Sequence, residues 1–304
     1  MTRLSPRTAL LLTLPPLLWA GNAVVGRLVV GSVPPLTMNF LRWVLAALLL
    51  LPLGWRVLRA PGELRTRWPY LLLTGTLGVG MYNALQYLAL VSSTPINVTL
   101  IASSMPVWML AVGALFYREH PGPKQILGAL LSLTGVLFVI ARGDPHALLS
   151  VRFVRGDLYV IVAIIAWAFY SWLLARPPGA MRGDHKPAWH WAEALLLQVL
   201  FGLLGAGAAA ALEQAAGTYA IRWDRGWTWA ALAYVAVGPA VLAYRCWGLG
   251  VATAGPALAA FFSNLTPLFA ALMSAAVLGE PPRWYHGAAF VLILAGIAVS
   301  GRRG

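Results

Sequence analysis

Two short polar segments, each closed by a proline, interrupt long apolar stretches of this 304-residue sequence: ASSMP ending at Pro106 and SNLTP ending at Pro267. A proline inside a helix removes one backbone hydrogen bond and frees a carbonyl, which in a membrane is tolerated only against protein or a wet cavity. Prolines and hydroxyls also serve as packing devices in membrane helices, but the recurrence favours binding. We therefore expect helix kinks at Pro106 and Pro267, with the ligand-binding polar groups of Ser103, Ser104 and Asn264 beside them.

Aromatic and amide side chains in other apolar stretches could complete such a binding site. Polar residues deep in a membrane helix are costly and tend to face the protein interior. Tyr82 and Gln86 are four residues apart and share one helix face, as do Trp167 and Tyr170. Aromatic walls with a few polar groups suit a neutral or zwitterionic molecule with an apolar body, although each aromatic residue alone could simply be a packing residue. The expected substrate-binding residues are Trp19, Asn22, Tyr82, Gln86, Ser103, Ser104, Trp167, Tyr170, Tyr244 and Asn264.

Four charged residues in or beside the apolar stretches are expected to have structural or gating roles: Arg42, Arg245, Glu119 and Glu280. A buried arginine can bind a substrate carboxylate, but it can also cap free carbonyls or extend towards the lipid headgroups. The structural role is favoured for Arg42, and both roles stay open for Arg245. The two glutamates stand at the ends of apolar stretches, where a capping role is simpler than a gating role.

Enzymatic chemistry finds no support in the sequence. It has no His-Glu-x-x-His motif, no paired aspartates for magnesium and no two facing acids, so an intramembrane enzyme is disfavoured and no metal or cofactor is expected. All nine acidic residues and five histidines fall in connections or in the first or last turns of apolar stretches. A proton-coupled carrier generally needs a titratable group deep in the membrane. A facilitator driven by the substrate gradient is therefore favoured, and a proton-coupled drug or metabolite antiporter is the alternative.

The composition places these residues in a membrane protein. Hydrophobic residues make up 60% of the chain and charged residues only 10%, with a mean hydropathy of +0.75. A helix crosses a bilayer with roughly 20 apolar residues. The sequence predicts an all-α membrane fold with ten such helices, at about 8–31, 35–55, 68–91, 94–117, 124–142, 156–176, 188–212, 227–250, 255–278 and 284–301.

The distribution of basic residues predicts the orientation of these helices. Thirteen of the 22 lysines and arginines lie on the side of the two termini and seven on the opposite side, which places both termini in the cytoplasm. Twenty arginines against two lysines suggest a GC-rich bacterial genome, and hence the bacterial inner membrane. The expected partners are membrane lipid and a small-molecule substrate. Nucleic acid is excluded because no strip of alternating basic and aromatic residues is present.

An internal repeat divides the chain into two halves. A shift of 161 residues brings Pro95 onto Pro256, Pro106 onto Pro267 and Glu119 onto Glu280 without a gap. Each copy holds five helices, an odd number, so the second copy enters the membrane from the opposite side. Inverted repeats of this kind are typical of secondary transporters, whose substrate site lies near the midplane between the halves. The expected domains are residues 1–142 and 156–304, joined by a linker at 143–155.

These patterns resemble a known family over the whole chain. The resemblance rests on Trp19-Ala20-x-Asn22, on Phe40-x-Arg42 and on the repeated spacing of Pro, Pro, Glu and Gly. On these residues the chain is similar to the EamA-type exporters of the drug/metabolite transporter superfamily. The resemblance implies a basket-shaped bundle around a central cavity that exports small metabolites by alternating access. Its aromatic residues look most like those of aromatic amino acid exporters, so an aromatic or neutral amino acid is the expected substrate. The sequence does not determine the oligomeric state and is consistent with a monomer.

Overall fold

The computed structural model describes residues 5–29, 31–59, 61–93, 95–150, 152–217, 220–278 and 283–301. These residues form ten helical segments, here called spans 1 to 10, and the predicted all-α membrane fold is confirmed. Six spans are single helices: α1 (Pro6–Val29), α2 (Pro35–Gly54), α7 (Pro123–Ile140), α8 (Arg155–Ala175), α9 (Trp191–Ala215) and α14 (Trp284–Ser300), which are spans 1, 2, 5, 6, 7 and 10.

The other four spans are built from shorter pieces. Span 3 joins α3 (Pro61–Thr74), η2 (Gly75–Met81) and α4 (Tyr82–Ser92), and span 8 joins α10 (Gly226–Val235), η6 (Ala236–Leu242) and α11 (Ala243–Ala254). Span 4 joins α5 (Pro95–Ala102) and α6 (Met105–Tyr117), and span 9 joins α12 (Pro256–Ser263) and α13 (Leu265–Leu278). Short 3₁₀ helices occupy the connections: η1 (Trp55–Arg59), η3 (Pro145–Ser150), η4 (Gly179–Met181) and η5 (Gly183–His185).

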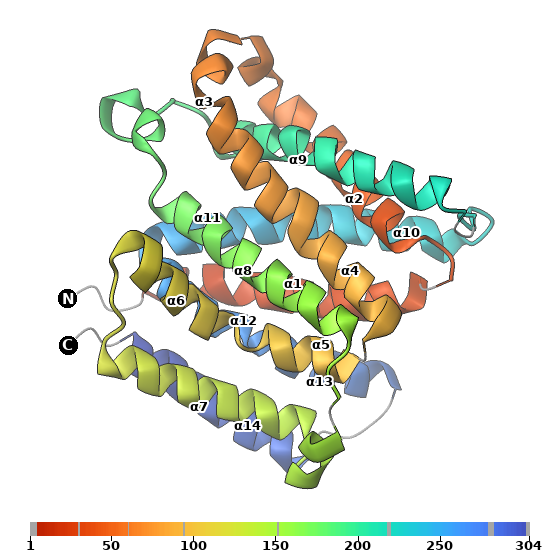
Figure 1. The fold of residues 1–304 in the computed structure, drawn as a ribbon, viewed down its shortest axis with the longest axis vertical. Coiled ribbons are helices and arrows are strands. Elements are labelled where there is room, and N and C mark those ends of the chain that lie inside the picture. Colours follow the sequence, from red (N-terminus) through yellow and green to blue (C-terminus); the bar gives the residue numbers. More distant parts are fainter. Residues whose placement is uncertain are drawn as a thin grey trace.

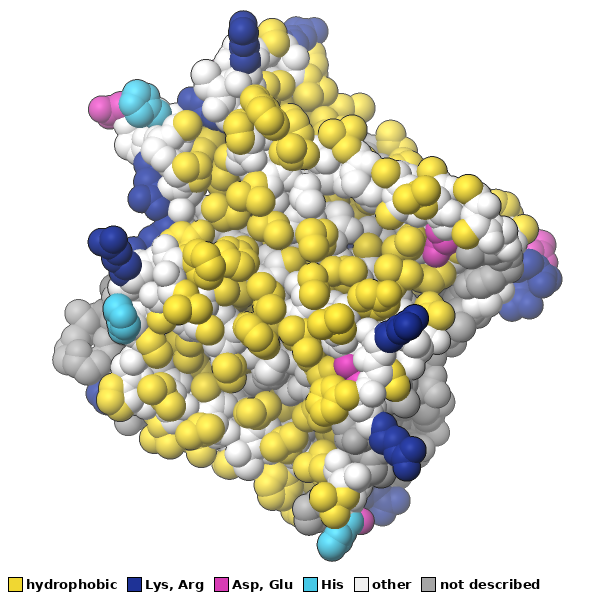
Figure 2. All heavy atoms as spheres, in the orientation of Figure 1, with side chains coloured by type: hydrophobic (Ala, Val, Ile, Leu, Met, Phe, Trp, Pro, Cys, Tyr) yellow, Lys and Arg dark blue, Asp and Glu magenta, His cyan; other side chains and the backbone are white. Residues whose placement is uncertain are grey.

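The surface of the molecule matches a bilayer. Among the described residues, seven helical segments are long and apolar enough to cross a membrane. Figure 2 shows hydrophobic side chains over the broad middle of the visible face, with lysine and arginine gathered at its margins. Large apolar side chains such as Val91 and Leu115 are almost fully exposed, at 73% and 77%. Since contiguous apolar surface of this extent is not exposed to water in soluble monomers, lipid is the solvent of this face.

The two halves pack against each other in a symmetric pattern. Span 5 lies along span 10 and span 2 along span 7, so equivalent helices of the two halves form two of the largest contacts. Span 3 packs on span 6, and the equivalent pair of spans 8 and 1 also packs together. α1 begins and α14 ends on the same face of the molecule (Figure 1), which we call the terminal face; the opposite face is the distal face. The chain is thus a pair of inverted five-helix repeats.

Spans 4 and 9 are interrupted at equivalent positions. α5 ends at Ala102 and α6 begins at Met105, while α12 ends at Ser263 and α13 begins at Leu265. The interruptions lie just before Pro106 and Pro267, because each proline lacks an N–H and its ring clashes with the carbonyl four residues earlier. In span 4 the hydroxyl of Ser103 donates a hydrogen bond to the carbonyl of Leu100, 2.6 Å away.

Spans 3 and 8 contain a feature that the sequence analysis did not predict. Each has a seven-residue π-helical segment in its middle, Gly75–Met81 in η2 and Ala236–Leu242 in η6. The two segments start 236 − 75 = 161 residues apart, the same shift that relates the two halves of the sequence. A π turn widens the helix by one residue and leaves carbonyls free for other donors, which is why such turns are frequent at functional sites.

Glycine lets span 7 approach span 3 very closely. A Cβ atom built on Gly202 of α9 would stand 2.6 Å from the carbonyl oxygen of Gly75 and 2.5 Å from Cβ of Val79. Gly202, Ala206 and Ala210 are all buried on one face of α9, as expected for a small-residue face in close helix packing. Span 7 thus lies against the π segment of span 3 at backbone distance.

Candidate binding site

An aromatic cluster centred on Trp167 fills the region between the two halves. The Trp167 ring has no exposed surface, and its centroid lies 4.5 Å from Tyr82, 5.0 Å from Tyr170 and 5.2 Å from Tyr244. Trp19 meets Trp167 edge to face at 5.3 Å. Five of the ten expected substrate-binding residues, from spans 1, 3, 6 and 8, therefore lie together in this cluster.

Two further tryptophans belong to the same cluster, and the sequence analysis missed both. Trp247 lies 5.5 Å from Trp19 and 5.5 Å from Trp167, and its indole N–H donates to Ser171 Oγ at 3.1 Å. Trp43 packs edge to face on Tyr244 at 4.9 Å. The position of Trp247 was accessible from its spacing, because it follows Tyr244 by three residues and so shares its helix face.

A polar network borders the aromatic cluster on the side of spans 2, 3 and 8. Arg42 Nη1 donates to Asn83 Oδ1 at 2.9 Å, and Asn83 Nδ2 donates to the Tyr244 hydroxyl at 3.3 Å. The Tyr244 hydroxyl in turn donates to the carbonyl of Gly78 in the π segment η2. On the other side, Tyr170 donates to Gln198 Oε1 at 3.1 Å.

The π segment of span 8 is used in the equivalent way. Trp19 Nε1 donates to the carbonyl of Pro239 at 3.3 Å, and Pro239 is the counterpart of Gly78 at the shift of 161 residues. Both bonds run from an aromatic side chain of one half to the backbone of the other. Trp167, the sequence counterpart of Trp19, does not complete the symmetry, since its buried Nε1 has no hydrogen-bond partner.

Two expected residues, Asn22 and Gln86, lie beside tyrosines. Tyr87 donates to Asn22 Oδ1 at 3.3 Å, which joins spans 1 and 3. Gln86 lies one turn after Tyr82 on the same helix face of α4. Both amides therefore belong to spans 1 and 3, which also contribute Trp19 and Tyr82 to the aromatic cluster.

The polar residues at the helix breaks are placed differently. The Ser103 and Ser104 hydroxyls donate to carbonyls of their own span, Leu100 and Ile101, both at 2.6 Å. Asn264 Nδ2 turns to Ser132 Oγ of α7 at 2.8 Å. In this structure these three side chains thus satisfy helix breaks or join helices, because a freed carbonyl competes for the nearest hydroxyl.

The two arginines expected inside spans have opposite environments. Arg42 has no exposed surface. Arg245 lies exposed on the outer side of α11, with its guanidinium 4.1 Å from the centroid of the Trp191 ring. Because a long aliphatic stem lets arginine reach the interface from a buried backbone, Arg245 has the snorkelling arrangement, and only Arg42 faces the interior.

A cavity of about 1020 Å³ opens at the terminal face. Both halves line it, since Glu119 and Gln125 contribute from the first and Thr253 and Ser300 from the second. Its wall also includes Val251, which follows Trp247 by one helical turn. Val251 of the cavity wall and Trp247 of the aromatic cluster are thus separated by about 6 Å along the axis of α11.

The rim of this terminal-face cavity carries an ion pair between the halves. Arg176 Nη2 contacts Glu119 Oε1, and both side chains are about half exposed. Glu119 therefore interacts across the repeat boundary, which is compatible with a gating role. Its counterpart Glu280 lies outside the described residues.

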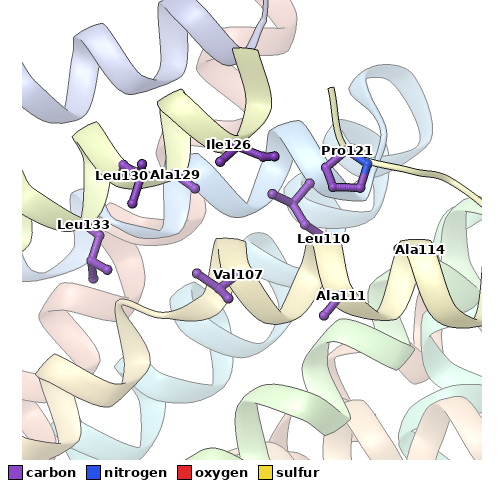
Figure 3. A pocket seen from close by; sticks show the side chains of 9 residues that line it. All are labelled: Val107, Leu110, Ala111, Ala114, Pro121, Ile126, Ala129, Leu130 and Leu133. Carbon is purple, nitrogen blue, oxygen red and sulfur yellow. The ribbon is translucent and has the colours of Figure 1, made fainter. Parts of the chain in front are cut away.

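A second pocket, of about 370 Å³, lies between α6 and α7 (Figure 3). The side chains of Val107, Leu110, Ile126 and Leu133 point into it, and every residue of its lining is apolar. A site without polar groups cannot orient a polar molecule. This pocket is therefore not the candidate substrate site.

On the distal face, a buried carboxylate joins two spans. Asp157, at the start of α8, is buried and accepts hydrogen bonds from Ser93 Oγ and, at 3.0 Å, from Asn97 Nδ2. These bonds hold the α4–α5 turn against span 6.

At the exposed α9–α10 connection, two hydrogen bonds from Arg222, both of 3.1 Å, hold the pKa of Asp224 below its ordinary value. Among the described residues there is no group of three or more His, Cys, Asp or Glu side chains that could hold a metal ion.

Comparisons with known proteins agree with this architecture. The model of the EamA-like transporter family matches the chain twice, at residues 6–141 and 154–302. An "Uncharacterized transporter" of Archaeoglobus fulgidus is 26% identical over 298 residues, which cover 97% of each chain. The "Aromatic amino acid exporter YddG" of Ancylobacter novellus is 24% identical over 277 residues, 89% of this chain and 88% of that protein.

Two further relatives extend the comparison. The "Probable amino-acid metabolite efflux pump" of Salmonella typhimurium is 26% identical over 294 residues, 93% of this chain and 90% of that protein. A solved crystal structure superposes on this one with a TM-score of 0.74 at 23% sequence identity, covering 96% of both chains. At that identity the structural likeness supports the fold alone.

Proposed function

The chain belongs to the EamA-like transporter family, and from this premise we propose that it exports small metabolites, above all amino acids with aromatic or neutral side chains. The chain is a multi-pass membrane transporter and not an enzyme. Two relatives support the choice of substrate, because one is named an aromatic amino acid exporter and another a probable amino-acid metabolite efflux pump.

One observation carries the proposal: the wall of the cavity at the terminal face includes Val251, one helical turn from Trp247 in an aromatic cluster built by both inverted repeats. Trp167, Tyr82, Tyr170 and Tyr244 offer several ring faces within about one ring diameter of each other, with hydroxyl groups beside them. Such a lining suits an apolar side chain attached to a polar head. Alternating access needs a cavity at one face and a packed centre that can open, and the terminal-face cavity and the buried cluster supply these two elements.

The positions of the acidic residues support facilitated transport over proton coupling. The two buried carboxylates that the structure describes, Asp157 and Glu213, lie in the first turn of α8 and the last turn of α9. Both are near the distal face, and both accept hydrogen bonds from neighbouring helices. A proton carrier needs a titratable group on the substrate path. The proposed transport is therefore driven by the substrate gradient, with a proton-coupled antiporter as the alternative.

The remaining assignments follow from the topology. We place the protein in a bacterial inner membrane with the terminal face in the cytoplasm, because the basic residues are concentrated on that side. Residues 1–142 and 156–304 are the proposed domains, with 143–155 as linker. With this orientation the described cavity faces the cytoplasm, where an exporter loads its substrate.

Counterflow in proteoliposomes tests the proposal. Vesicles loaded with unlabelled phenylalanine should accumulate labelled phenylalanine and leucine without an imposed pH gradient, whereas labelled glutamate should stay outside. Trp167→Ala should lower the exchange rate by about tenfold, since ring contacts contribute about 0.5–1.5 kcal/mol each and 1.4 kcal/mol corresponds to a factor of ten. Trp229→Ala is the matched control, because Trp229 is 57% exposed at a helix end.

Two results would contradict the proposal. Absence of counterflow for every amino acid of the panel would remove amino acids as substrates. Exchange that required a pH gradient, or that moved protons in a fixed ratio to substrate, would replace facilitation by proton coupling.

A further inference from the structure

Arg42 is a buried cation without a complete set of partners. Its side chain has no exposed surface, and only Nη1 is hydrogen-bonded, to Asn83 Oδ1 at 2.9 Å. Nε and Nη2 are buried without any hydrogen-bond partner. Arginine stays protonated in proteins, so the charge cannot be relieved by loss of a proton. The guanidinium also lies 5.1 Å from the centroid of the Trp43 ring, but a ring face supplies no acceptor for Nε and Nη2. A buried charge with unsatisfied donors is unfavourable, and a bound anion would supply the missing acceptors.

A role in capping backbone carbonyls does not account for these donors. The π segment η2 leaves carbonyls free near Arg42, but the carbonyl of Gly78 accepts from Tyr244 and that of Val79 from Asn39 Nδ2, at 3.5 Å. Neither of the two ion pairs that the described residues form includes Arg42. The structural role expected from the sequence therefore leaves two donors of Arg42 unused.

The two free donors have the geometry of a carboxylate site. In a guanidinium group, Nε and Nη2 carry parallel N–H bonds on one edge, and this fork matches the two oxygens of a carboxylate. Asn83 occupies Nη1 on another edge and so fixes the plane of the group. The donor pair left open is the pair that can bind a carboxylate with two hydrogen bonds.

The aromatic cluster lies next to this fork. Asn83 joins Arg42 to the Tyr244 hydroxyl, and Tyr244 contacts the Trp167 ring at 5.2 Å. A molecule with its carboxylate on Arg42 could thus place an apolar side chain among these rings. Its ammonium group could rest on a ring face, where a cation is attracted by the π electrons.

We propose that Arg42 binds the carboxylate of the transported amino acid through Nε and Nη2. This assignment rests on the proposed function, of which it names the recognition step. Because Arg42 has no exposed surface in this structure, the carboxylate reaches it only when the cluster around Trp167 opens. Binding of the anion is therefore linked to the rearrangement that alternating access requires.

Thermal unfolding of the detergent-solubilised protein, followed by tryptophan fluorescence, tests the assignment with three probes. L-Phenylalanine and 3-phenylpropanoate carry the carboxylate, and L-phenylalaninamide lacks it. The two carboxylates should raise the Tm of the wild-type protein and the amide should not, because a ligand stabilises the state that it binds. An equal response to the amide, or no response to either carboxylate, overturns the assignment.

Substitution of Arg42 separates recognition from structure. Arg42→Met should change the ligand-free Tm little, since removal of a buried charge offsets the lost hydrogen bond to Asn83, and should abolish the response to both carboxylates. Arg42→Lys keeps the charge but loses the fork, so the Kd for 3-phenylpropanoate should rise about 10- to 100-fold. Arg245→Met is the matched control, because Arg245 faces outward, and it should respond as the wild type does.

The outcomes distinguish this assignment from the proposed function. An Arg42→Met protein with a lower ligand-free Tm and an unchanged carboxylate response shows a structural arginine and overturns the assignment. If Arg42→Met does not fold, an unchanged Kd in Arg42→Lys overturns it instead. Amino acid counterflow that is equally fast in wild type and Arg42→Met would leave the proposed function standing without this site. Selective carboxylate binding without counterflow would keep the site and refute the proposed function.

Discussion

Replacement of Gly202 by alanine probes a close contact between helices of the two halves. Gly202 belongs to α9 in the second half, and its neighbours Gly75 and Val79 belong to η2 in the first. An added Cβ would stand 2.6 Å from the Gly75 carbonyl oxygen and 2.5 Å from Val79 Cβ, whereas ordinary van der Waals contact begins at 3.4 Å. One of these neighbours is backbone, so the helices must separate by about 1 Å to restore normal contact distances.

The expected cost of Gly202→Ala is about 1–3 kcal/mol of unfolding free energy, the range for overpacking a close-packed interior. The same helix offers a matched control in Gly205, three residues further on. A Cβ at Gly205 meets no atom within 4 Å. Gly205→Ala should be neutral or stabilise by up to about 1 kcal/mol, because alanine has the higher helix propensity.

Reversible unfolding in mixed detergent micelles, followed by circular dichroism, measures both variants under one set of conditions. The reasoning requires Gly202→Ala to unfold at a lower denaturant concentration than Gly205→Ala. If the two midpoints coincide, α9 does not lie against the π segment of span 3 as closely as described, and the close-packing argument fails.

Three further changes test other contacts. Glu213→Ala should destabilise by about 2 kcal/mol in the same unfolding assay, because the Glu213 carboxylate accepts from the Thr37 N–H at 2.7 Å and thereby caps α2 from another helix; unchanged stability would refute the cap. Asp157→Ala should increase hydrogen exchange at the α4–α5 connection, since it releases Ser93; unchanged protection there would show that the Asp157 hydrogen bonds do not hold this turn. Trp167→Ala should cost about 3–5 kcal/mol as a fully buried ring, and a cost below about 1 kcal/mol would show that the cluster is loosely packed.

Much of the fold was predictable because the bilayer imposes a length on every crossing helix. The ten apolar stretches correspond to the ten spans, and most of their ends agree within a few residues. The repeat was visible because identical residues recur at one shift without a gap. The π segments were not predictable. An inserted residue changes the backbone hydrogen bonding, but Gly75–Met81 and Ala236–Leu242 have the apolar composition of an ordinary membrane helix.

The site was predictable in its aromatic part and less so in its polar part. Trp167 could be chosen because it shares a helix face with Tyr170, and Tyr244 because it lies within an apolar span. Hydropathy and spacing do not tell which way an arginine points, so the burial of Arg42 and the exposure of Arg245 became visible only in the structure. The Asn264 side chain was equally ambiguous, because its partner Ser132 lies 132 residues away.

The hydrogen bonds from Tyr244 to Gly78 and from Trp19 to Pro239 each join a side-chain donor to a main-chain acceptor, and mutation affects the donor and the acceptor differently. Every amino acid has a main-chain carbonyl, so no substitution at an acceptor position deletes the acceptor itself. The donors are side chains and can be lost in a single step. Among homologues that retain these two hydrogen bonds, the donors Tyr244 and Trp19 should therefore vary less than the acceptor positions Gly78 and Pro239.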